Sequence, residues 1–182
     1  LVGEVNSQMV ALNSNINVLT RQIDRLAAER EQLQAQYADM VRTVVENDLK
    51  STGLFRMINR DAYPQFVKFN DMPDFNLWRA IRTDVLVQSK MTKAKNNMYK
   101  LEFYVWDVSS KEQIEAQSLM ASKKSIRRMA HLMADAIYER LTGEVGYFDT
   151  QIVFIAETGD VSNRTKRMAI MDQDGFGMRY LS

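Results

Sequence analysis

The chain has 182 residues, no cysteine and one histidine, and its 24 basic and 23 acidic side chains give a formal net charge of +1. This length suffices for one domain with a hydrophobic core, or for one domain with an appendage. The lack of cysteine excludes thiol chemistry and disulfides, and the charge balance argues against a nucleic-acid or anionic-lipid surface. No apolar run is long enough to span a membrane, and no signal peptide is recognisable.

Apolar residues repeat every seven positions from Val2 to Val44, and a second series follows three residues later each time. This 3.5-residue period predicts a left-handed coiled coil, and isoleucine before leucine in the core favours a parallel dimer. Arg30 occupies a core position, which disfavours this pairing. The alternative to a coiled coil is a single long helix that lies on its own domain. The predicted oligomerisation seam comprises Val5, Met9, Leu12, Ile16, Leu19, Ile23, Leu26, Leu33, Tyr37 and Met40.

The same helix is expected to continue through the segment DMVRTVVENDLKSTGLF, residues 39–55. Its apolar stripe widens here, with valines at 41, 44 and 45 and Leu49. A wide stripe is typical of a helix that packs on a sheet rather than in a two-stranded seam. Gly53 is the expected carboxyl-terminal cap.

The middle of the chain predicts short, alternating elements. Strands are expected at 55–58, 85–91, 99–108 and 113–121, and a short helix at 72–82 with Asp71 or Asp74 as its amino-terminal cap. Asn96 and Asn97 form a turn between the second and third of these strands. The last three strands should form an antiparallel meander.

The strand at 99–108 alternates between two kinds of side chain. Leu101, Phe103 and Val105 lie on one face, and Tyr104 and Trp106 lie on the other. We expect helices to cover only the aliphatic face, because a sheet of this size can leave its second face wet. Trp106 should then be exposed beside Tyr104.

The last third of the chain predicts a helix at 126–141, stopped by Gly143, and then short strands at 151–156, 167–172 and 176–181. The expected fold is α/β (α+β): a long coiled-coil helix running into a small mixed-sheet domain with two or three helices. The expected domains are a coiled coil at 1–38, an α/β domain at 39–149 and a final piece at 150–182.

Few residues suggest chemistry. His131 and Asp135 lie one helical turn apart, and a local hydrogen bond between them is expected. The sequence DQDG, residues 172–175, predicts a hairpin turn rather than a calcium loop, because the further oxygen ligands are missing. The basic residues at 123, 124, 127 and 128 are interpreted as the solvated start of a helix. No catalytic, cofactor-binding or metal-binding residue is assigned, and an enzyme is the least favoured class.

Residues 127–154, RRMAHLMADAIYERLTGEVGYFDTQIVF, resemble the end of the amino-terminal domain of the TolB family, which functions in the Tol–Pal cell-envelope system. The helix at 39–55, Trp78 and the strands DVLVQSKM and YKLEFYVWDV extend this resemblance from about Asp39 to Ser182. Heptads replace the family's first strand and its TolA-binding segment. The end of the chain, TKRMAIMDQDGFGMRYLS, resembles only the start of the first blade of the family's β-propeller.

The resemblance implies a non-catalytic, periplasmic protein-interaction module without a cofactor, whose family partners are TolA and Pal. A homodimer through the coil is also expected, with no nucleic-acid partner. The alternative is a coiled-coil oligomerisation or scaffold protein, natural or engineered, that carries the α/β domain as cargo. A nucleic-acid module is a third hypothesis, and the near-neutral charge disfavours it.

Overall fold

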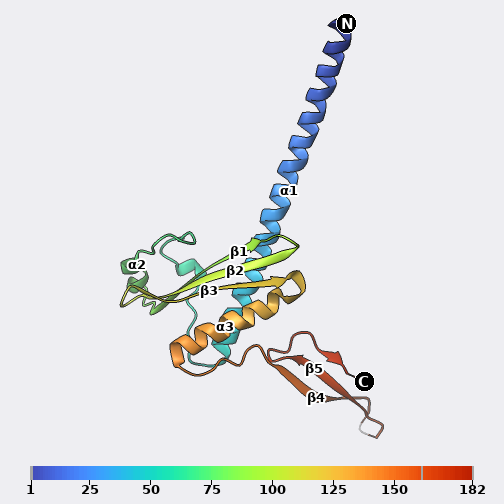
Figure 1. Cartoon of the computed structure of the whole chain (residues 1–182). Helices are drawn as coiled ribbons and strands as arrows, with labels where there is room; N and C mark the ends of the chain where they lie inside the picture. The colour runs from blue at the N-terminus through green and yellow to red at the C-terminus, as the bar shows by residue number, and fades with distance from the viewer. Residues whose placement is uncertain (1, 161, 182) are drawn as a thin grey trace. The chain divides into compact units, whose positions relative to one another are not determined.

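The computed structural model describes residues 2–160 and 162–181, and it leaves the side chains of residues 2, 3, 5 and 7 undescribed. The chain divides into two units, Leu1–Tyr37 and Ala38–Ser182, and helix α1 (Val2–Ser51) extends from the first into the second (Figure 1). None of the described helices is long and apolar enough to cross a membrane.

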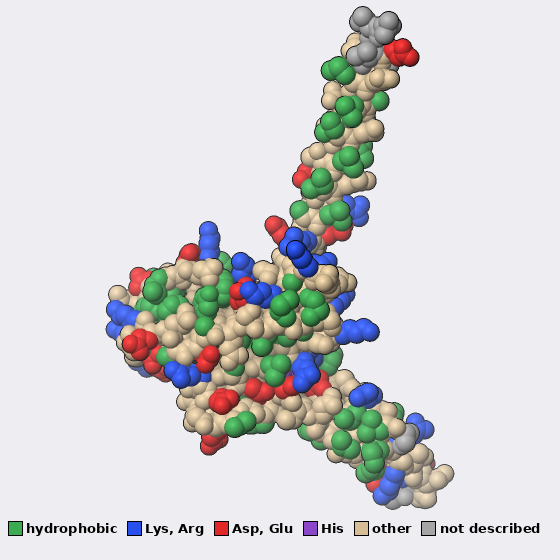
Figure 2. All heavy atoms as spheres, in the orientation of Figure 1, with side chains coloured by type: hydrophobic (Ala, Val, Ile, Leu, Met, Phe, Trp, Pro, Cys, Tyr) green, Lys and Arg blue, Asp and Glu red, His purple; other side chains and the backbone are tan. Residues whose placement is uncertain are grey.

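The first unit contains only the amino-terminal part of helix α1. Its heptad side chains from Met9 to Leu26 are exposed, from 50% for Ile16 to 66% for Ile23. Apolar side chains can be followed along this helix in Figure 2. Surface pairs such as Arg25 and Glu29, one turn apart with 2.9 Å between Nε and Oε1, support the helix locally.

The second unit is built on an antiparallel sheet in the order β1-β2-β3. Its strands are β1 (Val85–Lys93), β2 (Met98–Asp107) and β3 (Glu112–Ser122), so the predicted meander is confirmed. Asn96 and Asn97 both have positive φ, 55° and 59°, as the tight turn between β1 and β2 requires.

The aliphatic face of this sheet contributes to the main core. Leu101, Phe103 and Val105 are fully buried, and the valines of the wide stripe on α1 are buried too. Helix α3 (Ile126–Thr142) follows β3 through a short 3₁₀ turn, η2 (Lys123–Ser125), and contacts β2 and β3. Gly143 ends α3 in the left-handed conformation, with φ of 77°, and donates its N–H to the Glu139 carbonyl.

The second face of the sheet is covered around Trp106, although not at Met120 of β3, so the expected exposure of Trp106 is wrong. Trp106 is only 9% exposed and lies in a cluster with Phe75, Trp78 and Val108. Its Nε1 donates a 2.7 Å hydrogen bond to Oε1 of Gln88. The cover comes from the segment after α1, which includes η1 (Arg60–Ala62) and α2 (Phe75–Ala80).

Residues 55–58 form no strand, so the first sheet is antiparallel rather than mixed. The α+β class itself is confirmed. Helix α2 begins after Asp74, whose side chain accepts the N–H of Asn76, as the sequence predicts for one of its two candidate caps.

A second antiparallel sheet follows α3, in the order β4-β5-β6. Its strands are β4 (Gln151–Thr158), β5 (Thr165–Asp172) and β6 (Arg179–Tyr180). Ala169 is buried, whereas Val153, Ile155 and Met168 are about half exposed. Among the described residues this sheet therefore has almost no core of its own.

Candidate functional site

One acidic and one basic side chain are buried together between α1 and α3. Asp48 is 1% exposed and His131 is 3% exposed, and their Oδ2 and Nδ1 atoms lie 2.7 Å apart. Asp48 is in register with Val41, Val44 and Val45 on the inner face of α1, which brings its carboxylate to the middle of α3. Buried charges of this kind are stable only when paired.

The expected bond between His131 and Asp135 is wrong. The Oδ1 atom of Asp135 instead accepts the N–H of Phe148 at 2.6 Å, and its Oδ2 atom accepts that of Asp149 at 3.2 Å. Asp135 therefore fixes the connector between α3 and β4. His131 turns inward because α1, rather than the next turn of its own helix, supplies its acceptor.

The DQDG turn contributes the rest of this polar cluster. Nε2 of Gln173 donates to Oδ1 of Asp48 at 3.4 Å. Arg127, one turn before His131 on α3, forms an ion pair with Asp174 and lies 3.9 Å from the carboxylate of Asp172. The hairpin predicted for these residues thus packs its polar side chains on α1 and α3.

The surroundings of His131 raise its pKa above the ordinary value. Burial lowers the pKa, but the hydrogen bond that Asp48 accepts from the ring, the charge of Asp48 and the charge of Asp174 together outweigh burial and the opposing charge of Arg127. The carboxylates of Asp48 and Asp174 stabilise the protonated imidazole relative to the neutral ring.

Three possible metal ligands, from His131, Asp172 and Asp174, lie within 4.8 Å of one another. The carboxylates are already engaged: Gln151 donates to Asp172, the Phe176 N–H donates to Asp174, and Arg127 pairs with Asp174. Arg127 thus supplies the positive charge that a cation would supply. We interpret the cluster as an internal network of ion pairs.

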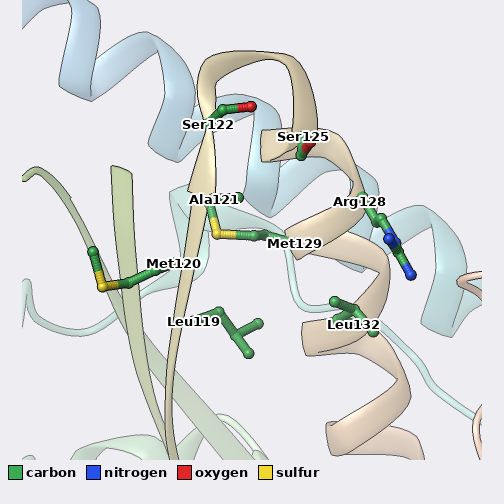
Figure 3. A pocket seen from close by; sticks show the side chains of 8 residues that line it. All are labelled: Leu119, Met120, Ala121, Ser122, Ser125, Arg128, Met129 and Leu132. Carbon is green, nitrogen blue, oxygen red and sulfur yellow. The ribbon is translucent and has the colours of Figure 1, made fainter. Parts of the chain in front are cut away.

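A groove lies on the opposite flank of α3, where this helix faces β3. One part has a volume of about 280 Å³ and is lined by Leu119, Met129 and Leu132 among others. Figure 3 shows Leu119 and Met129 in the space between β3 and α3, whereas Met120 points to the other side of the strand. A second part, of about 610 Å³, shares Leu132 and continues toward Glu115 and Glu139.

The predicted seam residues differ in exposure within the single chain. Leu33 and Met40 are partly buried, and Tyr37 is buried. The side chain of Val5 lies outside the described residues. The other seam residues, Met9, Leu12, Ile16, Leu19, Ile23 and Leu26, are all at least half exposed.

The family model of the TolB amino-terminal domain matches residues 16–114, just over half of the chain. This chain belongs to the TolB amino-terminal domain family. The match begins within the heptads and ends in β3. Among solved structures, the crystal structure of TolB from Acinetobacter baumannii is similar, with a TM-score of 0.71 and 22% sequence identity.

That comparison covers 78% of this chain but 35% of the Acinetobacter TolB chain, so this chain spans about a third of that protein's length. At this identity the likeness shows the fold.

Within the TolB-like fold, sequence reasoning missed Asp48 and Gln173 as partners of the cluster. A signal for Asp48 was present, because positions 41, 44, 45, 48 and 49 form one helical stripe.

Proposed function

We propose that this chain is a non-catalytic protein-interaction module of the Tol–Pal cell-envelope system, which acts in the periplasm in outer-membrane integrity and cell division. The family match over residues 16–114 carries this proposal. The buried polar side chains support it, because Asp48, Gln88 and His131 bond to one another, to Trp106 or to the backbone rather than facing a cavity.

TolA and Pal are the proposed partners, by family membership. We expect the full chain to bind purified TolA or Pal with a Kd of about 10 µM or tighter, in the range of transient interfaces. Isothermal titration calorimetry measures this directly, with an unrelated periplasmic protein as the control. Absence of binding to both partners at 100 µM protein, a concentration at which such affinities are visible, would contradict the proposal.

We also propose that the exposed stripe of the first unit pairs two chains as a homodimer. Six of its apolar side chains, from Met9 to Leu26, are half exposed or more. Each leucine gains about 1.5–3 kcal/mol when a second helix covers it. Free helices of this composition are marginal in water, so pairing would also support the helix itself.

The dimer is tested by replacing Leu19 and Leu26 with glutamate. Four unpaired carboxylates in one seam should dissociate the dimer, and light scattering should give the mass of one chain. Ser14→Glu with Ala28→Glu adds the same charge on the outer side of the heptads and should leave the dimer intact. A wild-type mass equal to one chain contradicts the pairing.

A scaffold function is the second candidate, and the exposed stripe favours it. A chain that dimerises through the heptads but binds neither TolA nor Pal would support this second function over the first. The two experiments together therefore separate an interaction module from an oligomerising carrier.

A further inference from the structure

Strand β3 is an edge of the first sheet. Among the described residues it pairs with β2 alone, from Glu112 opposite Asp107 to Ser122 opposite Met98. The backbone N–H and C=O groups on its other side have no strand to bond. Such an edge can accept one more strand from another polypeptide.

Helix α3 presents a matching line of side chains beside this edge. Arg128, Leu132, Ala136 and Arg140 are spaced four residues apart and so lie along one side of the helix. Leu132 is 37% exposed although it is flanked by the apolar Leu119 and Met129. The groove between β3 and α3 therefore offers both a free strand edge and an apolar pocket above it (Figure 3).

The two ends of the groove differ in chemistry. The end near Leu119 is apolar and has Arg128 at its rim. The other end is lined by three carboxylates, of Glu115, Asp135 and Glu139, and by one basic side chain, Arg140. Both oxygens of Asp135 already accept backbone N–H groups. Glu139 has no ionic partner within the part of the chain that the structure describes. A positive side chain on the bound segment would complement this acidic end.

We infer that the groove binds an extended segment of a partner protein, which adds to β3 as a fourth strand. Leu119 and Glu115 face α3 from the same side of β3, because they pair with Leu101 and Val105 of the buried face. They are four residues apart, about 13 Å along the strand. An antiparallel segment would therefore present an apolar side chain to the pocket and a lysine or arginine four residues later.

This inference rests on the proposed interaction function in one respect, because both require a protein partner. A second copy of the chain is a less suitable occupant. Its β3 edge, Glu112–Ser122, carries glutamates rather than a basic residue four positions after an apolar one. Its other edge, β1, has Leu86 four positions before Lys90, but Leu86 packs against the cluster around Trp106. Charge complementarity thus favours a different, basic-apolar segment.

The test uses the full chain and a labelled eight-residue peptide, Thr-Leu-Thr-Val-Thr-Lys-Thr-Ser, with leucine and lysine four positions apart. Fluorescence anisotropy should give a Kd of about 100 µM, as befits a short flexible ligand. Backbone amide shifts in NMR spectra should be confined to β3 and the facing side of α3. A peptide with glutamate in place of lysine should bind about tenfold more weakly.

Chain variants locate the binding. Leu132→Glu should weaken binding about tenfold by placing a charge in the apolar pocket. Glu139→Lys should weaken it similarly and should reverse the preference, so that the glutamate peptide binds better. Asp61→Lys, the same charge change on the distant η1 turn, should have no effect. Circular dichroism confirms that each variant is folded.

Two results would overturn the inference directly: no binding at 1 mM peptide, about ten times the expected Kd, or binding that neither groove variant changes. A third is a Leu132→Glu variant whose mass in light scattering is lower than that of the wild type, which would mean that a second copy fills the groove. If the peptide fails while TolA or Pal still binds, the groove assignment alone is wrong. If the chain binds neither the peptide nor TolA nor Pal, the proposed function is wrong too.

Discussion

Replacing Asp48 with alanine is expected to lower the free energy of unfolding of the 38–182 unit by about 3 kcal/mol. The substitution leaves the Nδ1 atom of His131 buried without its 2.7 Å partner and removes the acceptor of Gln173. We expect the lower end of the range for broken buried pairs, because the imidazole can lose its proton. Urea unfolding followed by tryptophan fluorescence measures the change, since Trp78 and Trp106 both lie in this unit.

Asp61→Ala, on an exposed turn, is the control and should have little effect. Asp48→Asn should cost less than Asp48→Ala, because its amide oxygen can still accept from the ring. A loss below about 1 kcal/mol in Asp48→Ala, the range of exposed pairs, would mean that the pair does not hold α1 to α3.

The same pair should make stability depend on pH. The pKa of His131 is raised in the folded chain, so its stabilising contribution is complete below the unfolded value of about 6.5. The contribution is lost as the pH rises through the folded value. The urea midpoint of the wild type should therefore fall as the pH rises above about 6.5, and His131→Gln should remove this fall. A midpoint that rises over the same interval would contradict the assignment.

Gly146→Ala is expected to be as damaging, at about 3 kcal/mol, the upper end for overpacking. A Cβ atom at Gly146 would lie 2.5 Å from the Cα and Cβ atoms of Asp135, which belong to the rigid middle of α3. The connector would have to move away. That movement breaks the bonds from the Phe148 and Asp149 N–H groups to Asp135 and exposes the fully buried Phe148 ring.

Gly143→Ala is the matched control, because a Cβ atom there meets nothing within 4 Å. Its cost comes only from the left-handed backbone, about 1–2 kcal/mol. Thermal unfolding of the two variants should therefore show the larger loss at Gly146. The reverse order would mean that the connector is not packed on α3 as closely as the structure shows.

The sequence predicted local structure well because that structure depends on neighbours in the chain. Alternation in β2, the paired asparagines and Gly143 each reflect contacts within a few residues. Trp106 was misplaced because its cover comes from Phe75 and Trp78, in a segment whose irregular aromatic pattern does not predict a layer of its own. An alternating strand with large aromatic side chains on its second face fits burial on both faces equally well.

The polar cluster of Asp48, His131 and Gln173 could not be predicted from local spacing either, because its contacts join distant parts of the chain. Spacing on one helix pointed to Asp135 as the partner of His131, whereas the true partner lies 83 residues away on α1. Helical spacing determines which side chains share a face, and it does not determine what packs against that face. The groove beside β3 was likewise invisible, because it depends on how far α3 lies from the strand edge.

The link from Gln173 to Asp48 joins two positions 125 residues apart, and His131 lies between them in sequence. An apolar residue at 48 would leave the imidazole without a hydrogen-bond partner, and an apolar residue at 131 would leave the carboxylate without its imidazole partner. Positions 48, 131 and 173 can therefore diversify in descendants of this gene only as a coupled set. An alignment deep enough to measure covariation should place these three columns together, even though no two of them belong to the same helix or strand.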